Sequence, residues 1–231
     1  MTFRHFMKKN VRSGSEASTV ISTNLKVVKL AILGFGGVGK TSIVKYYVNN
    51  KFDDEEEYGM VEVYQKQKVI NGESYILEIV DTCHELSESD TTVKQHVIGA
   101  DGYMLVFSIL NLDSLNALSD FRAQIRQARR QSTNFYDDVN LQIPMIIVAN
   151  KVDLNESEKL LNEMREKIQC FYLPFVQTSA KTGYGIQDAF DVLVEEVERT
   201  KNPAINHLQT TLKQRKLSYV QNFIKNRCNI L

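Results

Sequence analysis

Apolar positions along this chain fall into short segments whose spacing predicts strands and helices in regular alternation. Strands are predicted where β-branched apolar runs occur, over residues 27–33, 60–70, 73–81, 102–109, 144–150 and 171–178. Helices are predicted where apolar residues recur at helical spacing, over residues 41–47, 112–131, 155–169 and 185–200. The pair Asn71-Gly72 predicts a tight hairpin. This order predicts an α/β fold: a mostly parallel six-stranded sheet with one antiparallel edge strand and helices on both faces.

The pattern stops near both ends of the chain, which predicts one domain with two tails. Residues 1–24 are rich in Ser and Thr and lack periodicity, so we interpret them as a flexible extension. The domain is expected over residues 25–200, and residues 201–231 form a basic C-terminal tail. A chain of 231 residues that is 43% hydrophobic fits one compact domain of this kind.

Charge and cysteine content narrow the classes of function. Lys and Arg together number 28, as do Asp and Glu, so no net charge favours nucleic acid as a partner. Three scattered cysteines are too few for a disulfide framework, which indicates a reducing cytosol. No segment has the character of a signal peptide or of a membrane span.

The clearest chemical motif lies between the first predicted strand and the first predicted helix. It has the form G-x-x-x-x-G-K-[ST] and reads Gly34-Phe35-Gly36-Gly37-Val38-Gly39-Lys40-Thr41, with Ser42 next. Glycines let backbone N–H groups turn toward phosphate oxygens, Lys40 brings a positive charge to the outer phosphates, and the Thr41 hydroxyl can ligate Mg²⁺. The motif predicts a nucleotide-binding loop but does not separate ATPases, kinases and GTPases.

Two later motifs favour guanine as the base. Asn150-Lys151-Val152-Asp153 follows an apolar strand, and the Asp153 carboxylate can accept hydrogen bonds from the two N–H donors of guanine, a pattern that adenine lacks. The stem of Lys151 can lie along the ring. Alone, this match could also be an ordinary helix start with an acidic residue. The segment Thr178-Ser179-Ala180-Lys181, again at a strand end, strengthens the guanine interpretation because its backbone N–H groups could meet the base oxygen.

With these motifs in this order, residues 25–200 resemble the Ras superfamily of small GTPases, and the segment 64–73 looks most like its Ras and Rap branch. The resemblance implies the G domain form of the phosphate-loop NTPase fold, with GTP or GDP as ligand and Mg²⁺ as cofactor. It implies that Phe52 lies across the guanine ring and that Asp81 holds Mg²⁺ through water. The implied nucleotide site is Gly34, Phe35, Gly36, Gly37, Val38, Gly39, Lys40, Thr41, Ser42, Phe52, Asp81, Asn150, Lys151, Asp153, Ser179, Ala180 and Lys181.

The resemblance implies two switch segments, one around Gly59 and one around His84 and Glu85, and both depart from the family pattern. Gly59 stands where a threonine should ligate Mg²⁺ and touch the γ-phosphate. His84 and Glu85 stand where a glycine and a water-orienting glutamine are expected. Glu85 can accept a hydrogen bond from water but brings a negative charge near the γ-phosphate, so Lys40 and Glu85 are expected to support only slow hydrolysis. The alternative is a GTP-binding scaffold with negligible hydrolysis. An adenine nucleotide kinase or ATPase is disfavoured by Asp153.

The last four residues, Cys228-Asn229-Ile230-Leu231, fit the C-a-a-X signal for prenylation at Cys228. One lipid holds a protein only marginally, and the basic residues after Glu198 supply a second signal for an anionic leaflet. We expect a monomeric switch on the cytoplasmic face of the cell membrane, with a cytosolic pool. Its partners would be an exchange factor, an activating protein and effectors. The effector region is predicted at Glu56, Glu57, Tyr58, Gly59, Met60, Val61, Glu62, Val63 and Tyr64.

Overall fold

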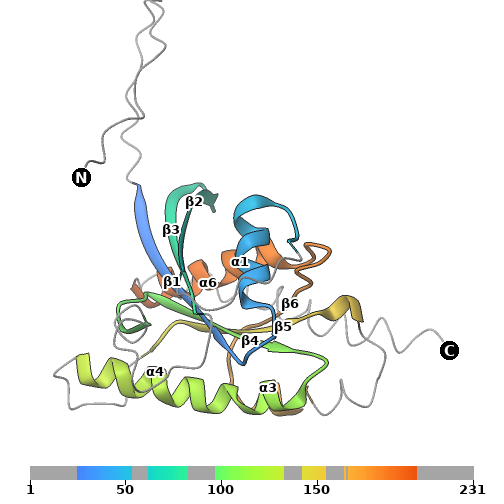
Figure 1. The fold of residues 1–231 in the computed structure, drawn as a ribbon. Helices are drawn as coiled ribbons and strands as arrows, with labels where there is room; N and C mark the ends of the chain where they lie inside the picture. Colours follow the sequence, from blue (N-terminus) through green and yellow to red (C-terminus); the bar gives the residue numbers. More distant parts are fainter. Residues whose placement is uncertain are drawn as a thin grey trace, which may run out of the picture.

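A computed structural model describes residues 25–53, 62–82, 97–132, 142–154, 164 and 166–201 of the chain (Figure 1). Strands and helices alternate in these residues as the sequence predicts. In chain order they are β1 (Lys26–Gly34), α1 (Lys40–Asn49), β2 (Glu62–Ile70), β3 (Glu73–Asp81), β4 (Gly102–Ser108), α3 (Leu112–Asn116), α4 (Leu118–Ser132), β5 (Met145–Asn150), the 3₁₀ turn η2 (Val152–Leu154), β6 (Phe175–Gln177) and α6 (Ile186–Lys201).

The six strands form one sheet in the order β2-β3-β1-β4-β5-β6. Every neighbouring pair is parallel except β2 and β3, which form an antiparallel hairpin through Asn71 and Gly72, both at positive φ. All side chains of β4 and β5 are buried, whereas those of the edge strand β2 alternate between half-buried and exposed up to its last residue. Central strands of such a sheet are covered on both faces and read as continuous apolar runs. The predicted fold class is confirmed.

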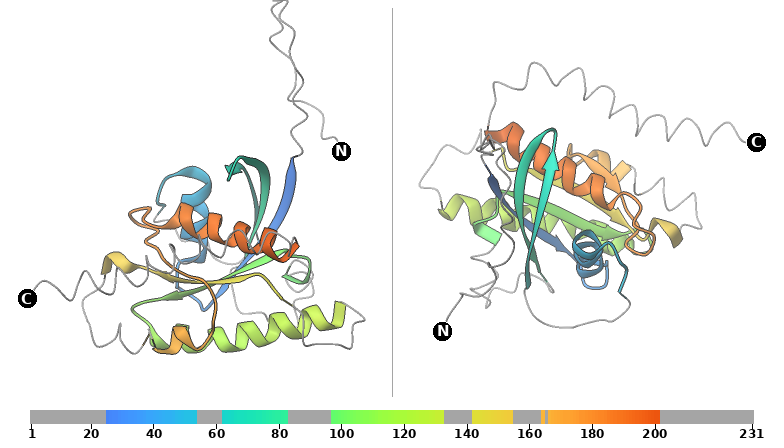
Figure 2. Two further views of the ribbon diagram at one scale, coloured as in Figure 1. Left: turned by 180° about the vertical axis from the view of Figure 1, so that it is seen from behind. Right: turned by 90° about the horizontal axis from the view of Figure 1, so that it is seen from above.

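Helices cover both faces of the sheet, and each layer has its own core (Figures 1 and 2). Helices α1 and α6 lie on one face, and α3 and α4 lie on the other. The first core, under α1 and α6, includes Ile43, Val44, Tyr47, Phe190, Leu193 and Val194. The second core, under α3 and α4, includes Leu115, Leu118, Phe121 and Ile125. Burial on both faces explains why the central strands β4 and β5 carry so few polar residues.

The strand register brings the predicted motifs to one edge of the sheet. β1 is central, with β3 on one side and β4 on the other. The chain leaves β1 through α1 toward the β2–β3 side of the sheet, and it crosses from β3 to β4 on the other side. Ile32 pairs with Asp81, and Gly34 pairs with Val106. Ligands of open α/β sheets bind at such a point, beyond the carboxyl ends of the strands.

Two predicted elements differ in extent from the structure. The strand expected over residues 171–178 is limited to Phe175–Gln177, because Tyr172 adopts a left-handed φ of 52° and Pro174, which has no backbone N–H, comes two residues later. The helix expected over residues 112–131 is divided at Ala117 into α3 and α4. The Asp120 N–H donates to the Ala117 carbonyl, a tighter turn than an α-helix makes. Most of the helix predicted over residues 155–169 lies outside the described residues.

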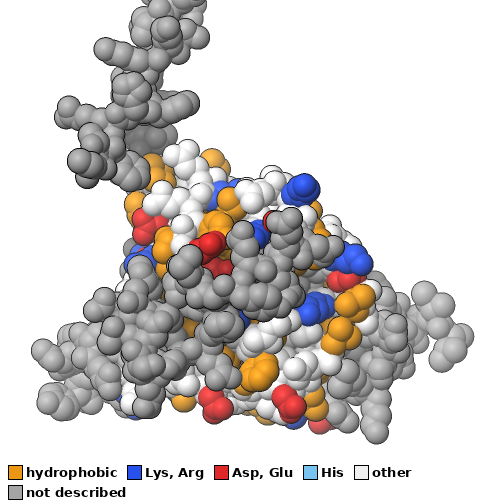
Figure 3. All heavy atoms as spheres, in the orientation of Figure 1, with side chains coloured by type: hydrophobic (Ala, Val, Ile, Leu, Met, Phe, Trp, Pro, Cys, Tyr) orange, Lys and Arg blue, Asp and Glu red, His pale blue; other side chains and the backbone are white. Residues whose placement is uncertain are grey.

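Acidic and basic side chains are interspersed on the visible face, with no large patch of one sign among the residues drawn in colour (Figure 3). This arrangement agrees with the balanced charge of the chain. Among the described helices, none is both long enough and apolar enough to cross a membrane.

Candidate functional site

The predicted phosphate loop joins the carboxyl end of β1 to the amino end of α1. Gly39 occupies the N-cap position of α1 at φ 92°, and no side chain caps this helix start. A Cβ added at Gly39 would lie 2.5 Å from Nδ2 of Asn150, so a larger residue fits there neither in backbone conformation nor in space. The first N–H groups of a helix have no partner within the helix and carry its positive dipole end. This helix start is therefore suited to an anion.

Lys40 directs its charge into the same loop. Its side chain is buried, and Nζ donates to the carbonyl oxygens of Gly34 at 2.8 Å and Phe35 at 3.0 Å. Thr41 and Ser42 follow in the first turn of α1 and are half-buried. The structure thus places an ammonium group and uncapped helix N–H groups around one short loop, an arrangement that attracts phosphate oxygens.

Asp81 ends β3 beside this loop. Its carboxyl group is buried, and burial raises the pKa of Asp81 above its ordinary value, although a hydrogen bond with Thr41 and the nearby charge of Lys40 oppose that shift. Its Oδ1 atom is buried without a hydrogen-bond partner. A buried carboxylate oxygen that lacks a protein partner fits a cation or a water bound to one, and oxygen ligands are those that Mg²⁺ prefers. Thr41 and Asp81 therefore fit this ion.

The Asn-Lys-x-Asp motif is tied directly to the phosphate loop. Nδ2 of Asn150 donates to the Val38 carbonyl at 2.9 Å, and Nζ of Lys151 donates to the Gly37 carbonyl at 2.7 Å. Asn150 is buried at the end of β5, and Lys151 takes a left-handed φ of 66° that turns the chain into η2. β4 lies between β5 and β1 in the sheet, so these two strands share no backbone hydrogen bonds. The side chains of Asn150 and Lys151 connect their carboxyl ends instead.

Asp153 lies in η2 and is joined to the loop after β6. The Ser179 hydroxyl donates to Oδ1 of Asp153 at 2.6 Å, which fixes the carboxylate. The N–H of Ala180 donates to Oδ1 of Asn150 at 3.2 Å, and that of Ser179 donates to the Tyr184 carbonyl at 3.0 Å. A base oxygen that reaches Ala180 would therefore share its N–H with Asn150. Lys181 is exposed next to these residues.

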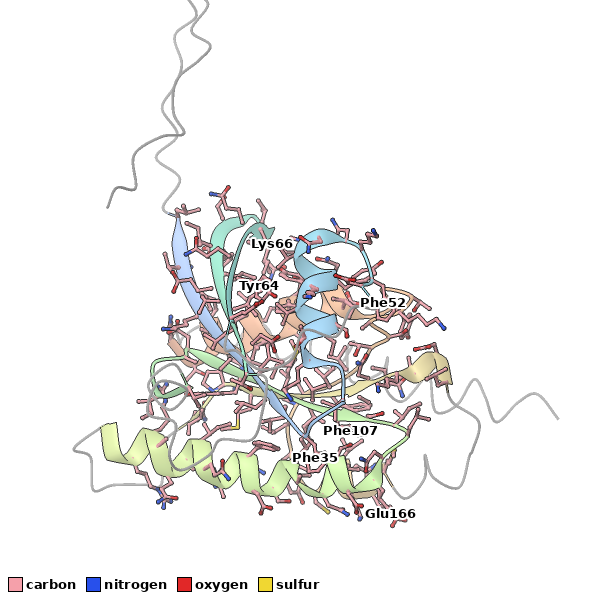
Figure 4. All side chains as sticks on the ribbon, viewed as in Figure 1. Phe35, Phe52, Tyr64, Lys66, Phe107 and Glu166 are labelled. Atoms are coloured by element: carbon pink, nitrogen blue, oxygen red, sulfur yellow. The ribbon has the colours of Figure 1, made fainter. Side chains whose placement is uncertain are left out.

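Phe52 lies just beyond α1 and is half-buried against the first core (Figure 4). Asn50, at a left-handed φ of 54°, caps α1 by donating its N–H to the Tyr46 carbonyl at 2.8 Å. Lys45 in α1 forms an ion pair with Asp53 at 3.8 Å. Both contacts bring residues 50–53 back along α1, which places Phe52 at the end of that helix.

The other predicted site residues fall in two groups. In β2, Val63 is exposed, while the Tyr64 ring packs on the first core and its hydroxyl bonds to Glu62. The remaining predicted residues lie outside the described part of the chain. They are Glu56, Glu57, Tyr58, Gly59, Met60, Val61, His84, Glu85 and Cys228.

Three segments that are far apart in the sequence therefore meet at one edge of the sheet, and they combine an anion-binding loop with fixed polar groups beside it. This combination defines an α/β nucleotide-binding protein of the phosphate-loop class. The model of the Ras family matches residues 29–199. The chain belongs to the Ras family and is a small GTPase, a molecular switch that binds GTP and GDP. GTP hydrolysis and control by regulators and effectors are general properties of this family.

Sequence motifs did not reveal the internal contacts of the site. The link from Asn150 to Val38 joins residues more than a hundred positions apart, and no local pattern announces it. The same holds for Tyr46, whose ring lies against Gly183 in the loop after β6. The positive φ of Gly183, 81°, could have been suspected from the glycine itself, but its aromatic neighbour could not.

Proposed function

We propose that this chain is a GTP-dependent switch of the Ras and Rap branch that acts at a membrane and hydrolyses GTP slowly without an activating protein. The proposal of guanine nucleotide binding is supported above all by the contact of Asn150 and Lys151 with the phosphate loop. Through it, the groups that would recognise the base and those that would bind phosphate are held at a set spacing.

Base recognition is assigned to Asp153. Ser179 fixes Oδ1 of this carboxylate, so its orientation is set before a base arrives, and preorganised acceptors lose little entropy on binding. Guanine offers two N–H donors to such an acceptor, and adenine offers none in that pattern. Competition against labelled GTP tests the assignment: excess GDP should displace the label and ATP at equal concentration should not. Displacement by ATP would refute a guanine site.

The proposed cofactor is Mg²⁺, held by the Thr41 hydroxyl and, through water, by Asp81. Bound there, the ion would neutralise charge on the outer phosphates. The chain contributes Lys40 from the other side of the loop, where Nζ would exchange its carbonyl partners for phosphate oxygens. Hydrogen bonds to anionic oxygens are stronger than those to carbonyls, which favours this exchange.

Slow hydrolysis is proposed from Glu85. A carboxylate at the position of the water-orienting glutamine accepts but cannot donate a hydrogen bond, and it repels the γ-phosphate. Single-turnover GTP hydrolysis should therefore rise by about tenfold in Glu85→Gln, since removing a nearby like charge is worth about 1.4 kcal/mol in the barrier. Glu88→Gln removes the same charge three residues further on and serves as the matched control, with an unchanged rate.

The same experiment addresses the alternative, a GTP-binding scaffold. A wild type with no measurable turnover over many hours, and an equally inert Glu85→Gln variant, would favour the scaffold and contradict our interpretation of Glu85. The nucleotide that remains bound to the purified protein reports on the same question. Mostly GDP would indicate turnover, and mostly GTP would favour the scaffold.

Membrane anchoring is proposed at Cys228, with the basic tail as the second signal. Fractionation of cells that express the wild type and Cys228→Ser should show the variant shifted from membrane to cytosol. Cys170→Ser, which changes an exposed cysteine of the domain, is the control and should fractionate like the wild type. Equal membrane fractions for wild type and Cys228→Ser would refute prenylation as the anchor.

Effector binding is proposed at residues 56–64, which end in β2. This strand lies at the edge of the sheet, and Val63 is 49% exposed. An edge strand with exposed apolar side chains offers both backbone groups and contact area to a partner. An exchange factor and an activating protein complete the proposed cycle, with the chain acting as a monomer on the cytoplasmic face.

A further inference from the structure

We propose that Tyr46, which belongs to none of the nucleotide-binding motifs, is a positioning residue for guanine recognition because its ring holds the loop after β6 in place. The proposal rests on the assignment of Asp153 as the base-recognition group. It adds a connection between α1 and the base side of the site, separate from the contacts that Asn150 and Lys151 make with the phosphate loop.

The ring of Tyr46 lies directly over Gly183. A Cβ added at Gly183 would be 2.0 Å from the Tyr46 hydroxyl oxygen and 2.2 Å from the ring carbon that bears it. Real Cβ atoms do not approach other atoms this closely, so only glycine permits the contact. Tyr46 is half-buried and packs on the first core, which gives the ring a fixed position from which to support the loop.

Gly183 stands at the centre of the loop that holds Ser179. The N–H of Gly183 donates to the Ser179 carbonyl at 2.8 Å, and the N–H of Thr182 donates to Oγ of Ser179 at 3.1 Å. The Ser179 hydroxyl in turn donates to Asp153 at 2.6 Å. A displaced Gly183 would therefore move Ser179 and release the Asp153 carboxylate. This chain of contacts connects the Tyr46 ring to the acceptor for the base.

Tyr46 also acts on the opposite side of the site. Its carbonyl accepts the N–H of Asn50, the contact that ends α1 and turns the chain toward Phe52. The same helix begins at Lys40 in the phosphate loop. One residue on α1 thus touches the loop that orients Asp153 and helps to cap the helix before Phe52. Through its ring Tyr46 supports the loop that orients Asp153, while its backbone takes part in the end of α1.

Gly183→Ala tests the contact, and Gly72→Ala is its matched control. Gly72 has a φ of 82°, almost equal to the 81° of Gly183, but no atom lies within 4 Å of a Cβ added there. Both substitutions therefore place a side chain at a similar left-handed φ, and only Gly183→Ala displaces a ring. We expect release of a fluorescent GDP analogue to accelerate by about tenfold in Gly183→Ala, and to stay within about twofold of wild type in Gly72→Ala.

Base discrimination separates positioning from a general loss of stability. Inosine diphosphate lacks the exocyclic amino group, one of the two donors to Asp153, so the ratio of its dissociation constant to that of GDP measures how well the carboxylate is placed. This ratio should fall in Gly183→Ala and in Tyr46→Ala. It should be retained in Tyr46→Phe, which keeps the ring, and in Gly72→Ala. Midpoints of urea unfolding, measured on all four variants, report stability separately.

Two results would overturn the proposal. One is a Gly183→Ala variant whose GDP release and base discrimination match those of Gly72→Ala. The other is a Tyr46→Ala variant that keeps the wild-type ratio. A wild type that fails to prefer GDP over ADP would instead refute the guanine site itself, so the two failures can be told apart.

Discussion

Truncation of the Asn150 side chain should destabilise the site because this one side chain joins the phosphate loop to the loop after β6. Its Nδ2 donates to the Val38 carbonyl at 2.9 Å, and its Oδ1 accepts from the Ala180 N–H and from the Thr178 hydroxyl, each at 3.2 Å. The side chain is 1% exposed, so these partners have no ready access to water when it is removed. Asn150→Ala leaves a buried carbonyl and a buried N–H unpaired, at about 1–3 kcal/mol each.

We expect Asn150→Ala to lower the free energy of unfolding of the nucleotide-free protein by about 3 kcal/mol, since a water molecule in the vacated space would recover part of the cost. Urea denaturation monitored by circular dichroism measures this change. Release of GDP should accelerate as well, because the phosphate loop and the loop after β6 lose their common partner. Asn150→Asp keeps the shape but turns the donor toward Val38 into an acceptor, so it should be destabilised similarly.

Asn116→Ala is the control for this prediction. Asn116 lies exposed in α3 and accepts one hydrogen bond, from Nζ of Lys167 at 2.6 Å. Loss of a single exposed contact should cost less than about 0.5 kcal/mol. If Asn150→Ala lost under about 1 kcal/mol and released GDP at the wild-type rate, the reasoning from buried unpaired groups would be refuted.

Three further predictions concern buried polar groups. The hydroxyl of Tyr47 is buried without a hydrogen-bond partner, so Tyr47→Phe should raise the free energy of unfolding by about 1 kcal/mol in urea denaturation, while its ring remains stacked on Phe190. Burial raises the pKa of Tyr75 and of Tyr103 to about 12, so their absorbance change should come well after that of exposed tyrosines in an alkaline titration. Above pH 10.0, the ordinary pKa of tyrosine, the native state holds more protons than the unfolded state, and stability should fall as pH rises. Without Mg²⁺, Asp81→Asn should raise the free energy of unfolding because it removes a charge whose burial is unfavourable, and it should abolish the stabilisation that Mg²⁺ gives to the GDP complex.

Three results would contradict these predictions. A loss of stability in Tyr47→Phe would mean that the hydroxyl has a partner. Completion of the tyrosine titration near pH 10.0 while the protein remains folded would contradict the burial of Tyr75 and Tyr103. An undiminished Mg²⁺ effect in Asp81→Asn would exclude this carboxylate from the metal site.

Local patterns were sufficient for the order of elements in the fold. The alternation of apolar runs predicted the strand and helix sequence, and Asn71-Gly72 predicted the hairpin, because both depend on neighbouring residues alone. The last strand was predicted too long because an apolar run also continues through the turn at Tyr172. Composition there resembles a strand, but the left-handed φ and the following proline end the pairing.

For the site, local motifs were sufficient to predict which groups are present: the phosphate loop, the Asn-Lys-x-Asp segment and the serine after β6. How these groups contact one another became visible only in the folded chain. Asn150 binds Val38, Tyr46 packs on Gly183, and Asp81 keeps one buried oxygen without a protein partner. Each of these relations depends on the strand order and on the space between elements, which no spacing along the chain encodes. The motifs predict which nucleotide binds, while packing across the sheet fixes the positions of the residues that would bind it.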